Sequence, residues 1–340
     1  IRGFADWAEA NPGRFTYPQP PAFHGTTFLK QALIGLTDNP EALQHPVDPT
    51  TFDRVTEPLW AFLDRLHPHL WRQGRAFPHG GPELIQLLGD GEIDIAINNM
   101  DVVYEAYHGL GNYQGNPHPN LRNLWNYAVS YHIYAVREDS GVKSLEDLTG
   151  KKFMPGGRGT AAELQTQQIF EILGIQPDYY FGSLEDGIDA IKNREAIGLL
   201  KIGSANDSTI VNIETSVPLV YLGLTDEQIR KVQEVLAYLK PIKMPAGTFR
   251  NQQELTTWAV TNGVMAHKDM PEEVAYNIVK AINEHYDDQA EAFPSLKQIN
   301  IPELTANNTS IPMHPGAIKY FEEIGVQIPK ELYPPEYPGN

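Results

Sequence analysis

Two segments of the sequence combine glycine with a small hydroxyl residue immediately before a helical run. Gly156, Gly157, Gly159 and Thr160 precede a helix that we expect to begin at Ala161. Free backbone N–H groups and the positive end of a helix attract a carboxylate or a phosphate, and glycine lets the backbone approach such a ligand closely. A plain turn with a helix cap is the alternative for such a segment taken singly.

The second such segment lies in the other half of the chain. Gly25 and Thr26 precede a predicted helix over residues 28–36. If each half folds into a similar unit, the two glycine-threonine loops face a common cleft. We therefore expect a small anionic solute to bind there, with its acid group held by the N–H groups of Gly159 and Thr160.

Polar and aromatic side chains follow other predicted strands or precede helices. Open α/β sheets bind ligands at the carboxyl ends of their strands. We expect Tyr104 and Tyr131 to pack against the body of the solute, while His79 and Asn99 contact its remaining polar atoms. For Asp101, capping of the following helix is the favoured interpretation. The predicted ligand-binding residues are Gly25, Thr26, His79, Gly80, Gly81, Asn99, Tyr104, Tyr131, Gly157, Gly159, Thr160, Ala161, Gly203 and Ser204.

Motifs for catalysis are missing from the sequence. It contains no Gly-x-Ser-x-Gly, no His-Glu-x-x-His and no P-loop ending in Gly-Lys-Ser/Thr. There is no cysteine, so thiolate metal sites and cysteine nucleophiles are excluded. The proline within His67-Pro-His69 favours a surface turn over a metal site. We predict no enzymatic activity, no cofactor and no metal.

The elements that would position these residues are repeated along the chain. Residues 3–17 and 144–154 each predict a short helix followed by a strand, and each leads into a glycine-threonine segment and another helix. Residues 82–97 and 183–200 form a second matched pair, in which apolar residues three apart give way to a short buried strand. Each half therefore predicts a compact α/β unit.

Two longer extended runs predict the connections between the halves. Residues 131–136 alternate and are rich in β-formers, and residues 256–265 offer a second such run. We predict an α/β fold of the two-lobed periplasmic binding protein type (type II), with each lobe a mixed sheet flanked by helices. Lobe one comprises residues 1–136 and 257–340, lobe two comprises residues 137–256, and two hinge strands join them.

Composition restricts the partners. The 340 residues carry 26 Lys and Arg against 43 Asp and Glu, a formal net charge of −17, which opposes binding to nucleic acid. No stretch approaches the ~20 apolar residues that span a bilayer. The lack of cysteine suits an oxidising compartment. We expect a monomer in the periplasm or outside the cytoplasm, with a signal peptide removed ahead of Ile1.

A succession of motifs from about residue 80 to residue 325 resembles the TAXI-type solute receptors of TRAP transporters. They include His79-Gly-Gly-Pro-Glu-Leu84, Gly91-Glu-Ile-Asp-Ile-Ala96, Asp101-Val-Val-Tyr104, Asp269-Met-Pro-Glu-Glu-Val-Ala-Tyr276 and His314-Pro-Gly-Ala317. The resemblance implies a receptor that binds glutamate, glutamine or an oxo-acid or dicarboxylate and delivers it to a membrane permease. The segment at residues 202–206 departs from the pattern expected there, which weakens the transfer of Gly203 and Ser204.

The first 75 residues or so resemble a different group. Residues 7–18, His24-Gly-Thr-Thr-Phe-Leu-Lys30 and His69-Leu-Trp-Arg-Gln-Gly-Arg75 are similar to YnjB-like or thiamine-type binding proteins of ABC importers. We therefore predict a solute receptor for a TRAP permease, with an ABC-importer subunit as the first alternative. An enzyme on the same fold is a further alternative, and it would need catalytic acids or a cofactor lysine in the cleft. A sensor domain is another, and it would need an attached signalling segment.

Overall fold

The computed structural model describes residues 3–20, 22–158, 160–292, 296–297 and 299–338. The chain divides into two compact units. The first comprises Ile1–Asn98, Glu105–Leu121 and Met265–Met270, and the second comprises Asn99–Tyr104, Arg122–Val264 and Pro271–Asn340.

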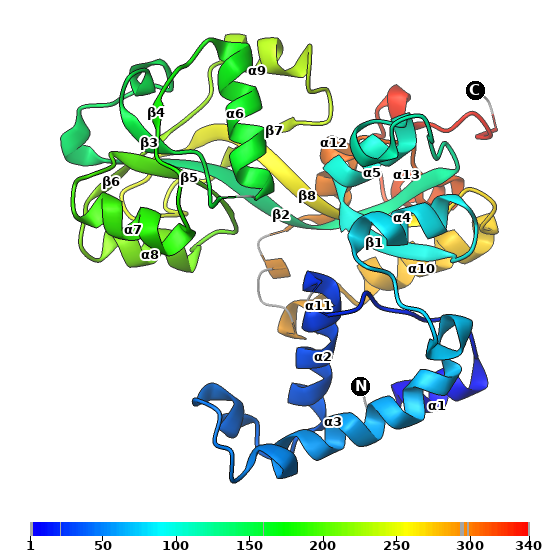
Figure 1. Cartoon of the computed structure of the whole chain (residues 1–340). Helices are drawn as coiled ribbons and strands as arrows, with labels where there is room; N and C mark the ends of the chain where they lie inside the picture. Colours follow the sequence, from blue (N-terminus) through cyan, green and yellow to red (C-terminus); the bar gives the residue numbers. More distant parts are fainter. Residues whose placement is uncertain (1–2, 21, 159, 293–295, 298, 339–340) are drawn as a thin grey trace. The chain divides into compact units, whose positions relative to one another are not determined.

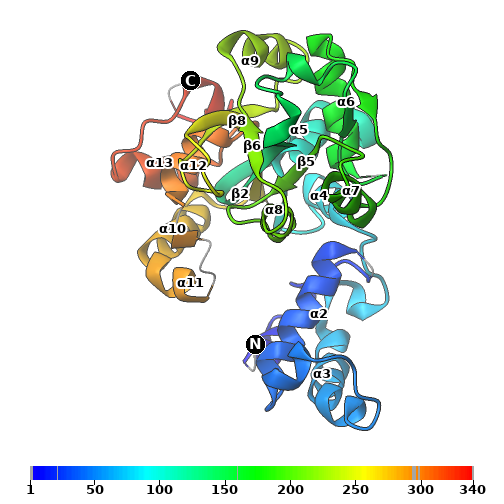
Figure 2. The ribbon, with the colours of Figure 1, turned by 90° about the vertical axis from the view of Figure 1, so that its left-hand side faces the viewer.

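The first unit is largely helical. Its elements are α1 (Phe4–Ala10), α2 (Phe23–Leu36), α3 (Phe52–Leu66), α4 (Gly81–Gly89) and most of β1 (Ile95–Asn99). Helix α3 contacts both α1 and α2, and Figure 2 shows α2 beside α3. Apolar side chains at helical spacing on α3, among them Leu59, Phe62, Leu63 and Leu66, pack with Ala32 of α2 into the core of these helices.

One predicted loop of the first unit is wrong. Gly25 and Thr26 lie inside α2, where the Thr26 N–H donates to the Ala22 carbonyl, and so do not form a loop before a helix. A Cβ atom on Gly25 would lie only 1.7 Å from the Pro18 carbonyl oxygen. Glycine is therefore needed here because it lets α2 pack directly against the segment around Pro18.

The second unit is built on a mixed sheet. Its longest strands, β2 (Leu121–Arg137) and β8 (Leu255–His267), run side by side (Figure 1). Strand β2 pairs antiparallel with β5 and β6, β8 pairs antiparallel with β7, and β3 pairs parallel with β4 and β5. The further strands are β3 (Lys152–Met154), β4 (Asp178–Tyr179), β5 (Gly198–Gly203), β6 (Leu219–Leu222) and β7 (Lys240–Met244).

Helices cover both faces of this sheet (Figure 1). Side chains alternate along β2, with Tyr134 and Val136 in one apolar core and Ile133 and Ala135 in the other. The first core includes residues of α6 and α9, and the second includes residues of α7 and α8. These helices are α6 (Ala161–Leu173), α7 (Leu184–Lys192), α8 (Ser208–Glu214) and α9 (Asp226–Gln233). The predicted α/β class, with a mixed sheet flanked by helices, is confirmed.

The carboxyl-terminal part of the second unit is helical. It contains α10 (Glu272–Glu284), α11 (Tyr286–Ala292), α12 (Ile301–Asn308) and α13 (Pro315–Glu323). Helices α10 and α13 pack closely against each other, and Gly316 of α13 touches the backbone of α10. Helix α5 (Met100–His108) belongs to both units, because residues 99–104 lie in the second and residues 105–108 in the first.

Several elements predicted from the sequence are present. The helix-then-strand pairs are α4 with β1 and α7 with β5, and the two extended runs are parts of β2 and β8. In Figure 1, β2 and β8 run from the elements β3–β7 to the helices α12 and α13 of the same unit. That course fits the role of hinge strands. The division into lobes at residues 136 and 257 stays a prediction.

Candidate functional site

Three predicted residues form the start of α4 in the first unit. Gly80 is the N-cap of α4, and Gly81 packs so closely on Asn98 that a Cβ atom would lie 2.6 Å from its amide nitrogen. The exposed His79 ring contacts Gln19 Nε2 at 2.7 Å through Nδ1, and its backbone N–H donates to Glu83 Oε2 at 2.7 Å. These contacts give the segment a structural role at the helix start.

The glycine-rich loop of the second unit leads into α6 as predicted. Thr160 is the N-cap: its hydroxyl accepts from the Glu163 N–H and donates to the Gly157 carbonyl at 2.6 Å. Gly156 has a φ of +137° and lies against the backbone of Ala162 and Glu163, so a Cβ atom there would meet the Glu163 nitrogen at 2.7 Å. Gly159 lies outside the described residues. The Thr160 hydroxyl thus stabilises the helix start, and the backbone N–H groups of the first turn remain the anion-attracting feature.

Two further predicted residues meet across the sheet. Tyr131 of β2 lies opposite Gly203, the last residue of β5. A Cβ atom on Gly203 would lie 2.4 Å from a carboxyl oxygen of Asp207, which accepts from Thr209 and Ile210 at the start of α8. Asp207 also forms an ion pair with Lys201 at 3.3 Å. That pair neutralises Lys201, which lies within β5.

Ser204 and the half-buried phenol of Tyr131 complete this region. Ser204 is exposed, and its carbonyl accepts from the Asp207 N–H. Burial raises the pKa of the Tyr131 phenol, so the hydroxyl is protonated at neutral pH and can donate a hydrogen bond. The pair of Tyr131 and Gly203 is the part of the predicted set that the structure brings together across two strands.

A largely desolvated carboxyl group, that of Asp101, lies at the start of α5. Asp101 Oδ1 accepts from the Val102 N–H at 2.8 Å, and Oδ2 accepts from Gln165 Nε2 of α6 at 3.0 Å. Burial raises the pKa of the Asp101 carboxyl, and the two hydrogen bonds act in the opposite direction. The side chain is partly exposed to solvent, so the carboxylate is desolvated but can be reached.

Asp101 and Gln165 line a small cavity inside the second unit. The other lining residues come from the start of α5, from the start of β7 and from β8: Met100, Tyr238, Leu239, Lys240, Ala259, Val260 and Thr261. Its volume of about 10 Å³ is room for roughly one water molecule. The ring of Tyr104, a predicted residue three positions after Asp101, lies 5.7 Å from the ring of Tyr238. Asn99, the last residue of β1, directly precedes α5.

This cavity lies at the predicted boundary between the lobes. Asp101 and residues 259–261 belong to predicted lobe one, whereas Gln165 and residues 238–240 belong to predicted lobe two. The hydrogen bond from Gln165 to Asp101 therefore crosses that boundary inside one compact unit. Separation of the two sides of the cavity would widen it and expose the side chains of Asp101 and Lys240 to solvent.

Buried polar groups surround the middle of β2. His132, Tyr134 and Trp258 are almost completely buried, and the Tyr134 hydroxyl and Trp258 Nε1 have no hydrogen-bond partner among the described residues. Desolvation lowers the pKa of His132 to about 3, with a small opposing effect from the nearby Gln165 amide. The imidazole is thus neutral at physiological pH.

Sequence reasoning assigned Asp101 to capping and missed Gln165 and Lys240. Asp101 does cap α5, but its second oxygen accepts from α6, a contact between residues 64 positions apart. Gln165 is polar yet only 7% exposed. Its position one turn after Ala161, on the helix that the glycine loop begins, is the signal that could have identified it.

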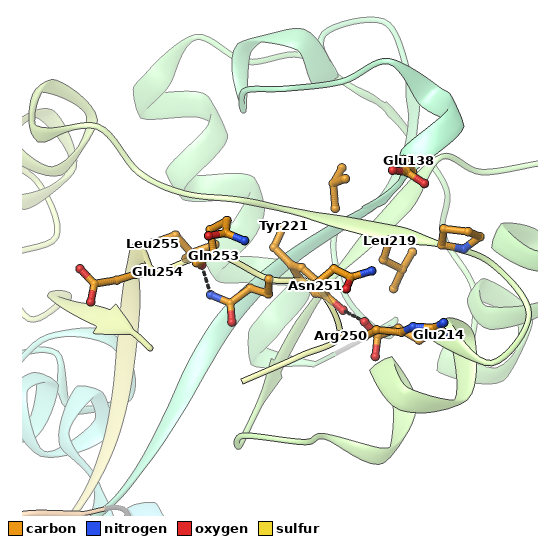
Figure 3. A pocket seen from close by; sticks show the side chains of 12 residues that line it. Glu138, Glu214, Leu219, Tyr221, Arg250, Asn251, Gln253, Glu254 and Leu255 are labelled. Atoms are coloured by element: carbon orange, nitrogen blue, oxygen red, sulfur yellow. Dashed lines mark hydrogen bonds between the residues drawn. The ribbon is translucent and has the colours of Figure 1, made fainter. Parts of the chain in front are cut away.

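Larger cavities lie elsewhere, among them two that none of the residues predicted from the sequence lines. Figure 3 shows one of about 520 Å³ in the second unit, beside β6 and residues 250–255; there the Tyr221 hydroxyl donates to Glu214 Oε1 at 2.5 Å. Glu138 and Glu254 also line it. The other, of about 780 Å³, lies in the first unit; two of its walls are joined by the exposed ion pair of Arg14 with Asp94.

The described part of the chain offers neither a clustered metal site nor a membrane-spanning helix. No group of three or more His, Cys, Asp or Glu residues there has the arrangement to hold a metal ion. Among the helices of those residues, none combines the length and the apolar character that a membrane span requires.

The chain belongs to the NMT1-like family, whose model matches residues 76–325. This is a family of substrate-binding proteins of the ABC type. The matched range covers nearly the same residues as the resemblance to TAXI-type receptors, and that finer assignment stays a prediction.

Individual relatives resemble parts of the chain. Protein YnjB of Escherichia coli (strain K12) is 50% identical over 92 residues, which are 27% of this chain and 24% of YnjB. The match thus spans about a quarter of the length of YnjB, and the predicted partial resemblance to that group is confirmed.

Two of the solved structures that are similar to the chain are also solute-binding proteins. The periplasmic aliphatic sulphonate binding protein SsuA from Escherichia coli is 13% identical with a TM-score of 0.37, and the match covers 78% of this chain and 77% of SsuA. A TctC solute binding protein from Polaromonas is 12% identical with a TM-score of 0.41, over 71% of this chain and 81% of that protein.

Proposed function

We propose that the protein is the extracytoplasmic substrate-binding subunit of an ABC importer, and that it binds a small solute with an acid group in the cavity around Asp101, Gln165 and Lys240. Membership of the NMT1-like family supports the ABC importer in preference to a TRAP permease as the membrane partner. The solute is handed on unchanged, so the protein performs no chemistry of its own.

The cavity at the predicted lobe boundary is the observation that carries this proposal. It collects a lysine, a carboxylate and an amide from elements that are distant in the sequence. The acid group of the solute has two sources of positive potential nearby, the Lys240 side chain and the amino-terminal end of α6, where Gln165 lies one turn from Ala161. The cavity is too small for a metabolite in this conformation. Solute entry therefore requires that β2 and β8 act as hinges, and binding then shifts the equilibrium between open and closed forms.

Binding is tested with the purified protein. Native mass spectrometry identifies any retained small molecule, and a thermal-shift screen over amino acids, oxo-acids, dicarboxylates and sulfonates follows. A ligand at 100 times its dissociation constant adds about 2.7 kcal/mol to the stability of the form that binds it. Steady turnover of any of these compounds would contradict a receptor without enzymatic activity.

The position of the site is tested by substitution. Lys240→Met should weaken binding of the identified solute by at least tenfold, because it removes the cation that lines the cavity. Lys243→Met is the matched control: Lys243 lies on the same strand, is exposed and pairs with Glu254, and its loss should leave affinity within twofold. Equal effects of the two substitutions would place the site elsewhere.

The transporter class is tested by uptake. The protein is combined with the membrane proteins encoded beside its gene in proteoliposomes, with radiolabelled solute outside. An ABC importer needs internal ATP hydrolysis, whereas a TRAP transporter needs an ion gradient. Uptake that follows a sodium gradient without ATP would favour the TRAP assignment that the sequence motifs suggested.

A further inference from the structure

Opposite charges line the same small cavity without pairing. Asp101 and Lys240 both contribute to its wall, and no ion pair joins them in the part of the chain that the structure describes. The nearby Lys201 and Lys243 behave differently, since each pairs with a carboxylate within 3.3 Å. A desolvated carboxylate and a cation that share a cavity but not an ion pair are complementary to a molecule that carries both charges itself.

The side of the cavity near Asp101 is rich in hydrogen-bond acceptors. Gln165 is 7% exposed; its Nε2 atom donates to Asp101, and its side chain also bonds to the buried His132 ring. An ammonium group has three donors and no acceptor, so it can donate both to Asp101 Oδ2 and to Gln165 Oε1. A carboxylate oxygen and an amide oxygen can each accept a second hydrogen bond beside the one that the protein supplies.

Aromatic rings lie next to these acceptors. Tyr238 lines the cavity, and Tyr104 contacts Tyr238 with ring planes inclined at 44°. The face of a tyrosine ring attracts a cation when the two are within about 6 Å. A carboxylate, an amide oxygen and aromatic rings together are the surroundings that a protonated amine prefers.

We infer that the solute is a zwitterion, with a protonated amine that binds Asp101 and an acid group that is held by Lys240 and the start of α6. This inference rests on the proposed function and narrows its substrate class. A dicarboxylate of the same length would place its second carboxylate against Asp101, and a simple monocarboxylate would leave Asp101 without a counter-charge. Asp101 is therefore the residue that selects amino acids over oxo-acids and dicarboxylates.

The test compares compounds that differ only in the amine. Isothermal titration measures L-glutamate against 2-oxoglutarate and 4-aminobutanoate against butanoate, with the intact protein. For at least one pair we expect the amine-bearing member to bind at least tenfold more tightly. Asp101→Asn keeps the side-chain shape and one of the two acceptor oxygens, removes the charge and should reduce that preference to less than threefold. Asp226→Asn, at the exposed first turn of α9, is the control and should leave the preference unchanged.

The outcomes separate the inference from the proposed function. If the acids without an amine bind as tightly as their amine-bearing partners, the inference of a zwitterionic solute is wrong, but the proposed receptor function is unaffected. If the preference persists in Asp101→Asn, the amine binds elsewhere and the assignment of Asp101 is overturned. If native mass spectrometry and the wider screen find no bound solute of any class, the proposed function itself fails. The comparison within each pair uses the unaltered protein, so it is decisive even if Asp101→Asn does not fold.

Discussion

Individual side chains of the second unit were only partly predictable from the sequence. The role of Thr160 at a helix start follows from its residue type, since a threonine before a helical run is a common N-cap, and the structure places its hydroxyl there. The roles of Gln165 and Lys240 depend on which elements come together in space, and a single sequence contains no local signal for that. Asp101 illustrates both cases, because one oxygen makes the local cap and the other accepts from Gln165.

The burial of His132 should make the protein sensitive to mild acid. Its pKa falls from 6.5 to about 3 on folding, so the unfolded chain binds a proton between these values that the folded chain does not. Stability therefore decreases as the pH falls below 6.5, by about 2–3 kcal/mol between pH 6.5 and 4.5. Urea unfolding as a function of pH measures this slope. His132→Gln should flatten it, whereas the exposed His45→Gln should not.

An ion pair near the carboxyl terminus should make the stability of the protein depend on pH in a lower range than His132 does. Arg122, whose side chain is 3% exposed, donates from Nε to Glu336 Oε1 at 2.6 Å and from a terminal nitrogen to Oε2 at 2.8 Å. The hydrogen bonds from Arg122 lower the pKa of Glu336 below its ordinary 4.5. The stabilisation is therefore complete above pH 4.5 and is lost as the pH falls through the lowered value.

The prediction for this pair is a pH-dependent effect of Glu336→Gln. At pH 7 the substitution leaves a buried guanidinium without its counter-charge and should cost about 1–3 kcal/mol of unfolding free energy. The difference from wild type should shrink as the pH approaches 3. Glu227→Gln removes an exposed pair with Lys231 and should leave stability nearly unchanged, because solvent screens that pair. A difference for Glu336→Gln that is the same at pH 7 and pH 3 would rule out charge as the cause.

At the scale of elements, hydrophobic periodicity predicted helices and strands more reliably than the glycine-threonine motif predicted loops. Residues 82–97 and 183–200 read as a helix followed by a strand, and both are present as α4 with β1 and α7 with β5. The glycine-threonine motif succeeded before α6 and failed at Gly25, which lies within α2. Glycine supports a loop and a close helix contact equally well, and only the position of Pro18 in space decides between them at residue 25.

A similar close contact joins α10 and α13. A Cβ atom on Gly316 would lie 2.2 Å from the Glu272 carbonyl oxygen and 2.7 Å from the Tyr276 nitrogen. Because both are backbone atoms, Gly316→Ala should force the helices apart and destabilise the second unit by about 1–3 kcal/mol. Gly3→Ala is the control, since no atom lies within 4 Å of the added methyl group. Thermal unfolding followed by circular dichroism measures both variants, and equal midpoints for the two would contradict this packing.

At the scale of the whole molecule, the sequence predicted the class of fold, and the division into lobes at residues 136 and 257 stays a prediction. The predicted lobe boundaries follow the two long strands, whereas the units separate the first 98 residues and a few short segments from most of the rest. The first 75 residues or so also depart from the motifs found later in the chain. Their helices have a core of their own, which includes Leu66 and Ala32.

Two separate cores predict that the two units respond independently to a substitution in one of them. Leu66 is fully buried in the core of α1–α3, so Leu66→Ala should cost that unit about 2–5 kcal/mol. In differential scanning calorimetry we expect the transition of the first unit to move down by several degrees, while that of the second unit stays in place. Phe153→Leu, in the core of the second unit, should do the reverse. If both substitutions shifted a single transition, the units would unfold cooperatively, and the first unit would be an integral part of the binding fold and not an attached body.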